Sequence, residues 1–111
     1  MDNSENFHQQ LRDLAPLISD ARINVMKKES ELKKEFWVQI CKAKDDGERS
    51  YNHQKSKAEA TNEYYNATMA VAIAKANLDQ LQLERAATEM QFEEWRTKMA
   101  NLRSERQRYG A

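Results

Sequence analysis

Apolar residues in the second half of the chain recur alternately every four and three positions. This spacing places side chains along one face of a helix, and its repetition over several heptads is typical of a coiled coil. The pattern therefore predicts one long helix with an apolar seam. The predicted seam residues are Tyr64, Ala67, Val71, Ala74, Leu78, Leu81, Arg85, Thr88, Phe92, Trp95, Met99, Leu102, Arg106 and Tyr109.

The first half of the chain carries a similar stripe, which predicts a second helix. Near residue 36 the stripe changes phase, as it does at a stutter in a coiled coil. Its members are Leu11, Leu14, Ile18, Ala21, Val25 and Leu32, followed after the phase change by Phe36, Ile40 and Ala43.

Gly and Pro, which interrupt regular structure most often, occur only at Pro16, Gly47 and Gly110. Pro16 suggests a break or kink after a short helical segment, with Asp13 as a cap. Gly47 can end one helix, Asp45 or Asp46 can cap the next, and Gly110 stands where a final helix would stop. We therefore expect a single helical domain over 1–111, with a short N-terminal segment (1–13), a first arm (14–44), a turn (45–47) and a long second helix (48–109).

The two seams predict an all-α fold, a long antiparallel coiled-coil hairpin. If the chain turns tightly about residue 46, facing residue numbers add up to about 92. Ala21 then faces Val71, and Val25 faces Ala67, so that every seam residue meets a seam residue. Large residues meet small ones, which fills the layers between helices without voids.

This arrangement leaves the second helix longer than its partner. Phe7 would face residue 85, so the stretch from residue 88 to residue 109 would have no partner within the chain. An uncovered apolar stripe of this kind marks an interaction site. The predicted interaction residues are Phe92, Trp95, Met99, Leu102 and Tyr109.

Three occupants could cover this stripe. A second copy of the chain would give a helical-bundle homodimer, which is the arrangement we expect. Alternatively, the N-terminal segment could detach at Pro16 and fold across the stripe, or a different protein could bind there. The acidic N-terminal end and the basic C-terminal end would attract each other in the first two cases.

Composition limits the classes of protein to consider. Charged residues make up 32 % of the chain, and 18 basic residues balance 18 acidic ones. No stretch is apolar enough to span a membrane, and the polar start does not resemble a secretory signal. The single Cys41 cannot form a disulfide within the chain. We therefore expect a cytoplasmic, reducing location and no membrane partner.

The sequence offers no catalytic, cofactor-binding or metal-binding cluster. His8 and His53 would lie near opposite ends of the hairpin, and Cys41 is a better candidate for a small packed residue than for a nucleophile. No spacing matches a zinc site, and no Gly-rich loop could hold phosphates. We therefore expect a protein that is not an enzyme.

Nucleic-acid binding is the alternative function. Basic residues with aromatic neighbours can contact phosphates and stack on bases, although the balanced net charge argues against strong non-specific binding. The candidate contacts are Lys42, Lys44, Arg49, Lys55 and Lys57 near the turn, with Arg96, Lys98, Arg103, Arg106 and Arg108 toward the C-terminus. The function we favour is a protein–protein interaction module, acting as a scaffold, adaptor or inhibitor.

Overall fold

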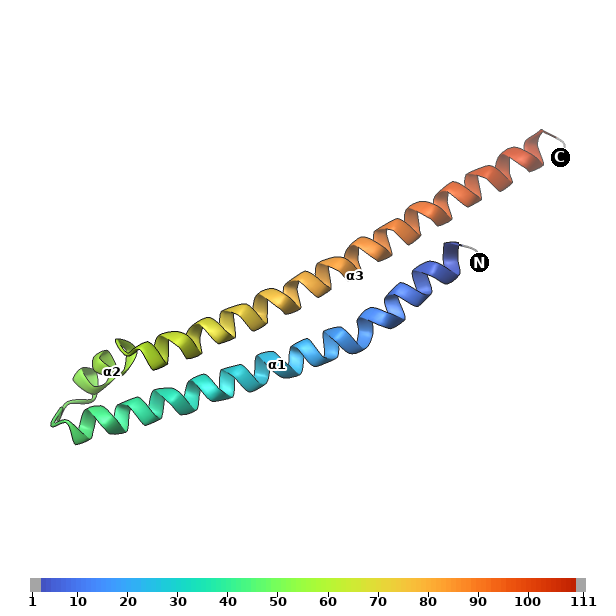
Figure 1. Cartoon of the computed structure of the whole chain (residues 1–111). Coiled ribbons are helices and arrows are strands. Elements are labelled where there is room, and N and C mark those ends of the chain that lie inside the picture. The colour runs from blue at the N-terminus through green and yellow to red at the C-terminus, as the bar shows by residue number, and fades with distance from the viewer. Residues whose placement is uncertain (1–2, 110–111) are drawn as a thin grey trace. The chain divides into compact units, whose positions relative to one another are not determined.

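The protein forms three helices and no strand in residues 3–109, which are the residues that the computed structural model describes (Figure 1). Helix α1 spans Asn3–Asp45, α2 spans Tyr51–Glu59 and α3 spans Asn62–Arg108. The predicted all-α class is confirmed. The chain divides into two compact units: unit 1 comprises Met1–Ile18 and Gln80–Ala111, and unit 2 comprises Ser19–Asp79.

Helix α1 runs through Pro16 without interruption, so the predicted separate segment over residues 1–13 is wrong. Proline lacks the N–H that would bond to the carbonyl of Arg12, and this usually weakens a helix. Here the proline is exposed, whereas Leu14 and Ile18 on either side of it are buried. We infer that burial of these flanking residues offsets the lost hydrogen bond.

The end of α1 follows the predicted glycine stop. Gly47 has a φ angle of +99°, in the left-handed region that favours glycine. Its N–H donates to the carbonyl of Lys44 (3.1 Å), and the N–H of Glu48 donates to the carbonyl of Ala43 (3.1 Å). This pair of bonds is the Schellman motif, which satisfies the last carbonyls of a helix.

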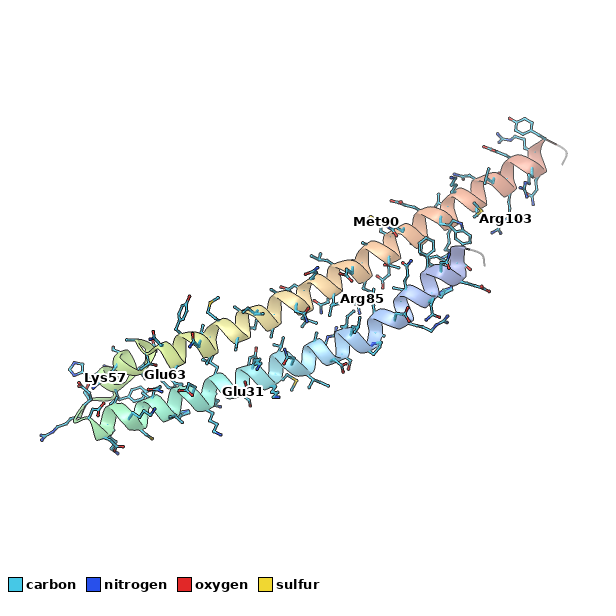
Figure 2. All side chains as sticks on the ribbon, viewed as in Figure 1. Glu31, Lys57, Glu63, Arg85, Met90 and Arg103 are labelled. Carbon is cyan, nitrogen blue, oxygen red and sulfur yellow. The ribbon has the colours of Figure 1, made fainter. Side chains whose placement is uncertain are left out.

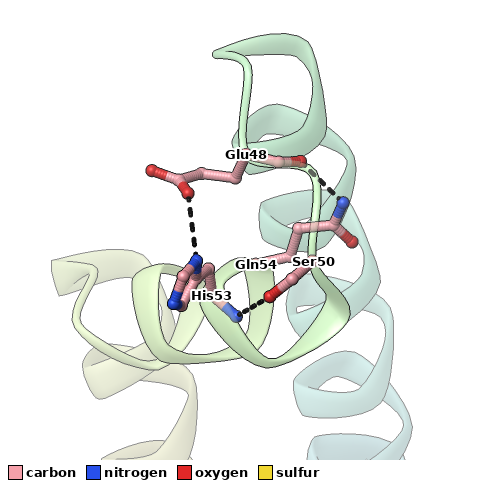
Figure 3. Close-up of polar contacts among 4 residues, drawn as sticks. All are labelled: Glu48, Ser50, His53 and Gln54. Atoms are coloured by element: carbon pink, nitrogen blue, oxygen red, sulfur yellow. Dashed lines mark hydrogen bonds and ion pairs between the residues drawn. The ribbon is translucent and has the colours of Figure 1, made fainter.

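The predicted continuous second helix over 48–109 is wrong, because the segment after Gly47 folds into the short helix α2 before α3 begins. Ser50, not Asp45 or Asp46, caps α2: its hydroxyl accepts a hydrogen bond from the N–H of His53 at 3.1 Å (Figure 3). The side chain of Gln54 is buried and donates to the carbonyl of Glu48 at 2.8 Å, which holds α2 against the preceding loop.

The break between α2 and α3 contains neither Gly nor Pro. Thr61 makes it through its side chain, whose hydroxyl donates to the carbonyl of Ala58 (2.8 Å) and accepts from the N–H of Tyr64 (3.2 Å). The first of these bonds helps to close α2, and the second caps α3. The absence of Gly and Pro between residues 48 and 109 therefore did not exclude a helix boundary in this stretch.

Burial follows the predicted seams closely. Every predicted seam residue of α1 is buried or half-buried. The same holds along α3 from Tyr64 to Met99, whereas the last three members of the predicted seam, Leu102, Arg106 and Tyr109, are exposed. The heptad spacing therefore identified the packed face of both long helices, except at the C-terminal end of α3.

The predicted register is wrong. In unit 2, Phe36 contacts Tyr64 rather than residue 56, with ring centroids 6.1 Å apart. Glu29 pairs with Lys75 at 3.5 Å rather than facing residue 63. The shift arises because the connection is not a three-residue turn: α2 and its flanking loops occupy the residues between Asp45 and Asn62.

Candidate functional site

Unit 1 contains a cluster of aromatic side chains at the predicted interaction stripe. The ring of Phe7 lies 5.6 Å from that of Phe92 and 6.4 Å from that of Trp95, measured between centroids. Phe92 also stacks on Trp95 at 6.1 Å and meets the ring of His8 edge-on at 5.1 Å. Aromatic pairs at these separations stabilise a fold beyond the area that they bury.

This cluster corrects the predicted extent of the uncovered stripe. Phe7 lies against Phe92 and Trp95 instead of facing residue 85, so both of these interaction candidates are half-covered within unit 1. The covering segment is the start of α1 itself, which did not have to detach at Pro16 to reach them.

The uncovered part of α3 begins later than predicted. Met99 is half-buried, and every residue from Ala100 to Tyr109 is exposed. Leu102 is 39 % exposed, and Tyr109 is 78 % exposed. The final turns of α3 therefore gain no stabilisation from packing in the described residues, although packing is the main source of helix stability in proteins.

Two polar residues interrupt the seam of α3, and they have different surroundings. Thr88 is buried, and its hydroxyl donates a hydrogen bond to the carbonyl of Glu84 at 3.0 Å. Burial of Thr88 therefore leaves its hydroxyl group with a hydrogen-bond partner. Arg85 (labelled in Figure 2) is partly exposed and pairs with Glu89 at 3.9 Å. Thr88 is therefore a buried polar position within the seam, whereas Arg85 lies at the edge of the seam.

Replacing Phe7 with alanine is expected to lower the free energy of unfolding by about 2 kcal/mol, because a half-buried ring loses its contacts with Phe92 and Trp95. Urea unfolding followed by circular dichroism measures this change. The fluorescence of Trp95 should also move to longer wavelength as water reaches its ring. An unchanged unfolding midpoint would show that the start of α1 contributes nothing to unit 1.

The basic candidates near the C-terminus are exposed on α3. Arg96 pairs with Glu93 at 3.2 Å and its guanidinium lies 5.7 Å from the centre of the Phe92 ring. Lys98, Arg103 and the two arginines beyond it have no ion pair among the described residues (Arg103 is labelled in Figure 2). The structure therefore leaves four basic side chains, Lys98, Arg103, Arg106 and Arg108, in solvent at this end of α3.

The basic candidates near the connection are partly neutralised. Lys57 pairs with Asp46 at 3.3 Å, and Lys55 pairs with Glu59 at 3.9 Å. The other three, Lys42, Lys44 and Arg49, are exposed without an ion pair in the described part of the chain. The positive field at this end of unit 2 is weaker than the count of five cations suggests.

Metal-ligating side chains, the thiol of Cys41 and the imidazole of His53 are the remaining groups of chemical interest. No group of three or more His, Cys, Asp or Glu side chains in residues 3–109 lies close enough to hold a metal ion. Cys41 is a free, exposed thiol. His53 lies 4.0 Å from the carboxylate of Glu48 and is mostly exposed (Figure 3). No described helix is long and apolar enough to cross a membrane.

Sequence reasoning missed a set of large apolar residues outside the seams. The most prominent is Trp37, which packs edge-on against Phe36 at 5.4 Å and is 49 % exposed. The sequence did contain a signal for its exposure. Trp37 directly follows the seam residue Phe36, and adjacent residues on a helix point about 100° apart, so Trp37 has to point away from the seam. The other members of the set include Ile23, Met26, Ile73, Leu83 and Met90.

Known proteins give no guide to the role of these surfaces. No protein-family model matches the chain. No curated protein sequence and no solved structure matches it significantly either. What the surfaces bind has to be inferred from their own chemistry.

Proposed function

We propose that this protein is a non-enzymatic interaction module, an antiparallel helical hairpin that associates with another protein chain through the uncovered end of α3. The observation that carries this proposal is the continuous exposure of residues 100–109, next to the half-buried Met99 and the partly exposed Leu102. This helix end packs on nothing in the described part of its own chain, and a partner that covers its apolar residues would stabilise it.

The antiparallel arrangement is supported by contacts within each unit. In unit 2, Glu29 pairs with the later residue Lys75, whereas Phe36 pairs with the earlier residue Tyr64. Residue numbers therefore fall along α3 as they rise along α1. In unit 1, the start of α1 contacts α3 through Phe7 and Phe92, which is compatible with this arrangement.

The thin core supports association. No large side chain among the described residues is fully buried, and the buried apolar residues are Leu14, Ile18, Ala21, Ile40, Ala43, Ala58, Val71 and Ala74. Half of these are alanines, which contribute little apolar area. Small chains with such cores commonly gain stability by assembling. A second copy is the partner we favour, and the free Cys41 thiol fits a reducing, cytoplasmic location.

If folding is coupled to self-association, thermal stability depends on protein concentration. We expect the unfolding temperature, measured by circular dichroism, to rise as the chain is concentrated. A monomer that folds alone would unfold at the same temperature throughout the dilution series. That result would contradict the favoured partner.

Nucleic-acid binding remains the second candidate, because Lys98, Arg103, Arg106 and Arg108 are exposed without an ion pair in the described residues, and the last two lie within three positions of exposed Tyr109. The zero net charge weighs against it. Binding to a single-stranded oligonucleotide should weaken steeply as salt is added if these cations contact phosphates. A response that does not depend on salt, or no binding, would remove this candidate.

A further inference from the structure

Helix α3 carries a second apolar stripe, and this one is exposed along its whole length. Its members alternate by four and three positions from residue 69 to residue 90, which is the heptad spacing of a coiled-coil seam. Leu83 is 70 % exposed, and Met90, which is labelled in Figure 2, is 63 % exposed. We call this surface the outer stripe; its members are Met69, Ile73, Ala76, Gln80, Leu83, Ala87 and Met90, all of them exposed.

The outer stripe points away from the packed seam of α3. Each of its members stands two positions from a seam residue, as Leu83 does from Leu81, and such a step turns the helix by about 200°. The contacts of α3 with Phe7 and Phe36 are made by seam residues. Because all seven stripe residues belong to the one helix α3, their common face follows from helix geometry. The stripe therefore offers about 32 Å of accessible helix surface.

The outer stripe contains no charged residue. Six of its seven members are apolar, and the seventh, Gln80, is uncharged. The nearest charged residues between positions 69 and 90 are Asp79 and Glu84, which lie on opposite edges of the stripe. A continuous exposed apolar surface of this kind marks an interaction site. Heptad spacing that is sustained over about three heptads is the pattern that packs against another helix of the same period.

We propose that the outer stripe of one copy of the chain packs against the outer stripe of a second copy. This inference goes beyond the proposed function, which concerns the uncovered end of α3. It adds a second contact surface in a different part of the same helix.

The lack of charge favours a second copy as the occupant. In a dimer with a two-fold axis the same surface meets itself, so a charged stripe would repel its own copy and an uncharged one does not. An antiparallel pairing brings like edges together and so keeps Asp79 of one copy apart from Glu84 of the other. The small residues Ala76 and Ala87 also leave space beside Leu83 in which side chains of the other copy can interdigitate.

Removing apolar side chains from the stripe tests this pairing. Ile73→Gln with Leu83→Gln should weaken self-association by at least about 100-fold in sedimentation equilibrium, because each substitution occurs twice in a two-fold dimer. Both side chains are exposed in the single chain, so the variant keeps its core contacts. The matched control, Ile23→Gln with Leu17→Gln, makes the same changes at exposed positions of α1 and should associate normally.

A second variant is expected to strengthen association. Gln80→Leu removes the one polar side chain from the stripe, and a polar residue at a seam position lowers the stability of a coiled coil. The association constant should rise by at least about ten-fold. Misfolding of the variant would not produce this gain. Gln10→Leu, at an exposed position of α1, is the control and should leave the association constant unchanged.

The outcomes separate this inference from the proposed function. If the chain self-associates but the Ile73, Leu83 variant associates as strongly, the outer stripe is not the contact and the inference is overturned, whereas the end of α3 is tested by its own variant. An association constant that does not rise in Gln80→Leu, or an equal loss in the α1 control, would also overturn it. A mass of one chain at every concentration would overturn it as well, and the end of α3 would still be open to a different protein.

Discussion

Replacing Ile40 with alanine is expected to lower the free energy of unfolding by about 3 kcal/mol. Ile40 is one of the larger buried side chains of unit 2, with 6 % of its surface exposed. Its removal costs the transfer energy of the lost methyl groups and leaves a cavity that the rigid helices fill only in part.

Ile23 provides the matched control for this prediction, because the same substitution removes the same atoms from a side chain that is 61 % exposed. Ile23→Ala should change the free energy of unfolding by no more than about 0.5 kcal/mol. Urea unfolding of both variants measures the difference. Equal losses at the two positions would mean that Ile23 is also buried, as it would be in an assembly that covers the outer face of α1.

Replacing both Met99 and Leu102 with serine is expected to weaken self-association by about 30-fold, or about 2 kcal/mol. Each side chain is already partly covered, so a partner can gain only part of the energy of full burial at each. Phe92 and Trp95 are poorer choices for this test, because both contact Phe7 and their loss would also destabilise unit 1.

Sedimentation equilibrium of the Met99→Ser, Leu102→Ser variant gives its association constant. The control makes the same chemical changes elsewhere, at the exposed residues Leu17 and Met26 of α1. We expect this second variant to associate as the unaltered chain does. If both variants weakened association equally, general loss of apolar surface would be the cause and the end of α3 would have no special role.

The seams could be predicted from the sequence because the heptad spacing follows directly from helix geometry. Burial of Leu14 and Ile18 in α1, and of Val71 and Ala74 in α3, follows that spacing. The glycine stop at Gly47 could be predicted for a similar reason, since a positive φ angle favours glycine.

The connection between the long helices could not be predicted in the same way. Side-chain hydrogen bonds of Ser50 and Thr61 define the ends of α2, and serine and threonine also occur within helices, so the sequence does not single these two out. The predicted connection was too short, and the predicted register in unit 2 was therefore wrong as well. The predicted length of the uncovered stripe was also wrong. The predicted stripe began at residue 88, whereas Phe7 covers α3 as far as Trp95.

The interaction surfaces were partly visible in the sequence. Leu102 and Tyr109 lie on the exposed end as expected. Trp37 could not be predicted from the seam because it lies outside the heptad spacing, and only the structure shows that its ring packs on Phe36 yet remains 49 % exposed. The role of each surface stays a prediction, since composition and spacing describe surfaces and not their partners.

The absolute mass of the purified chain, measured by light scattering across a dilution series, tests the central claim most directly. The proposed self-association predicts a multiple of the 13.0 kDa chain mass that falls toward a single chain on dilution. A mass of one chain at every concentration would contradict self-association, and the uncovered end of α3 would then have to bind a different macromolecule.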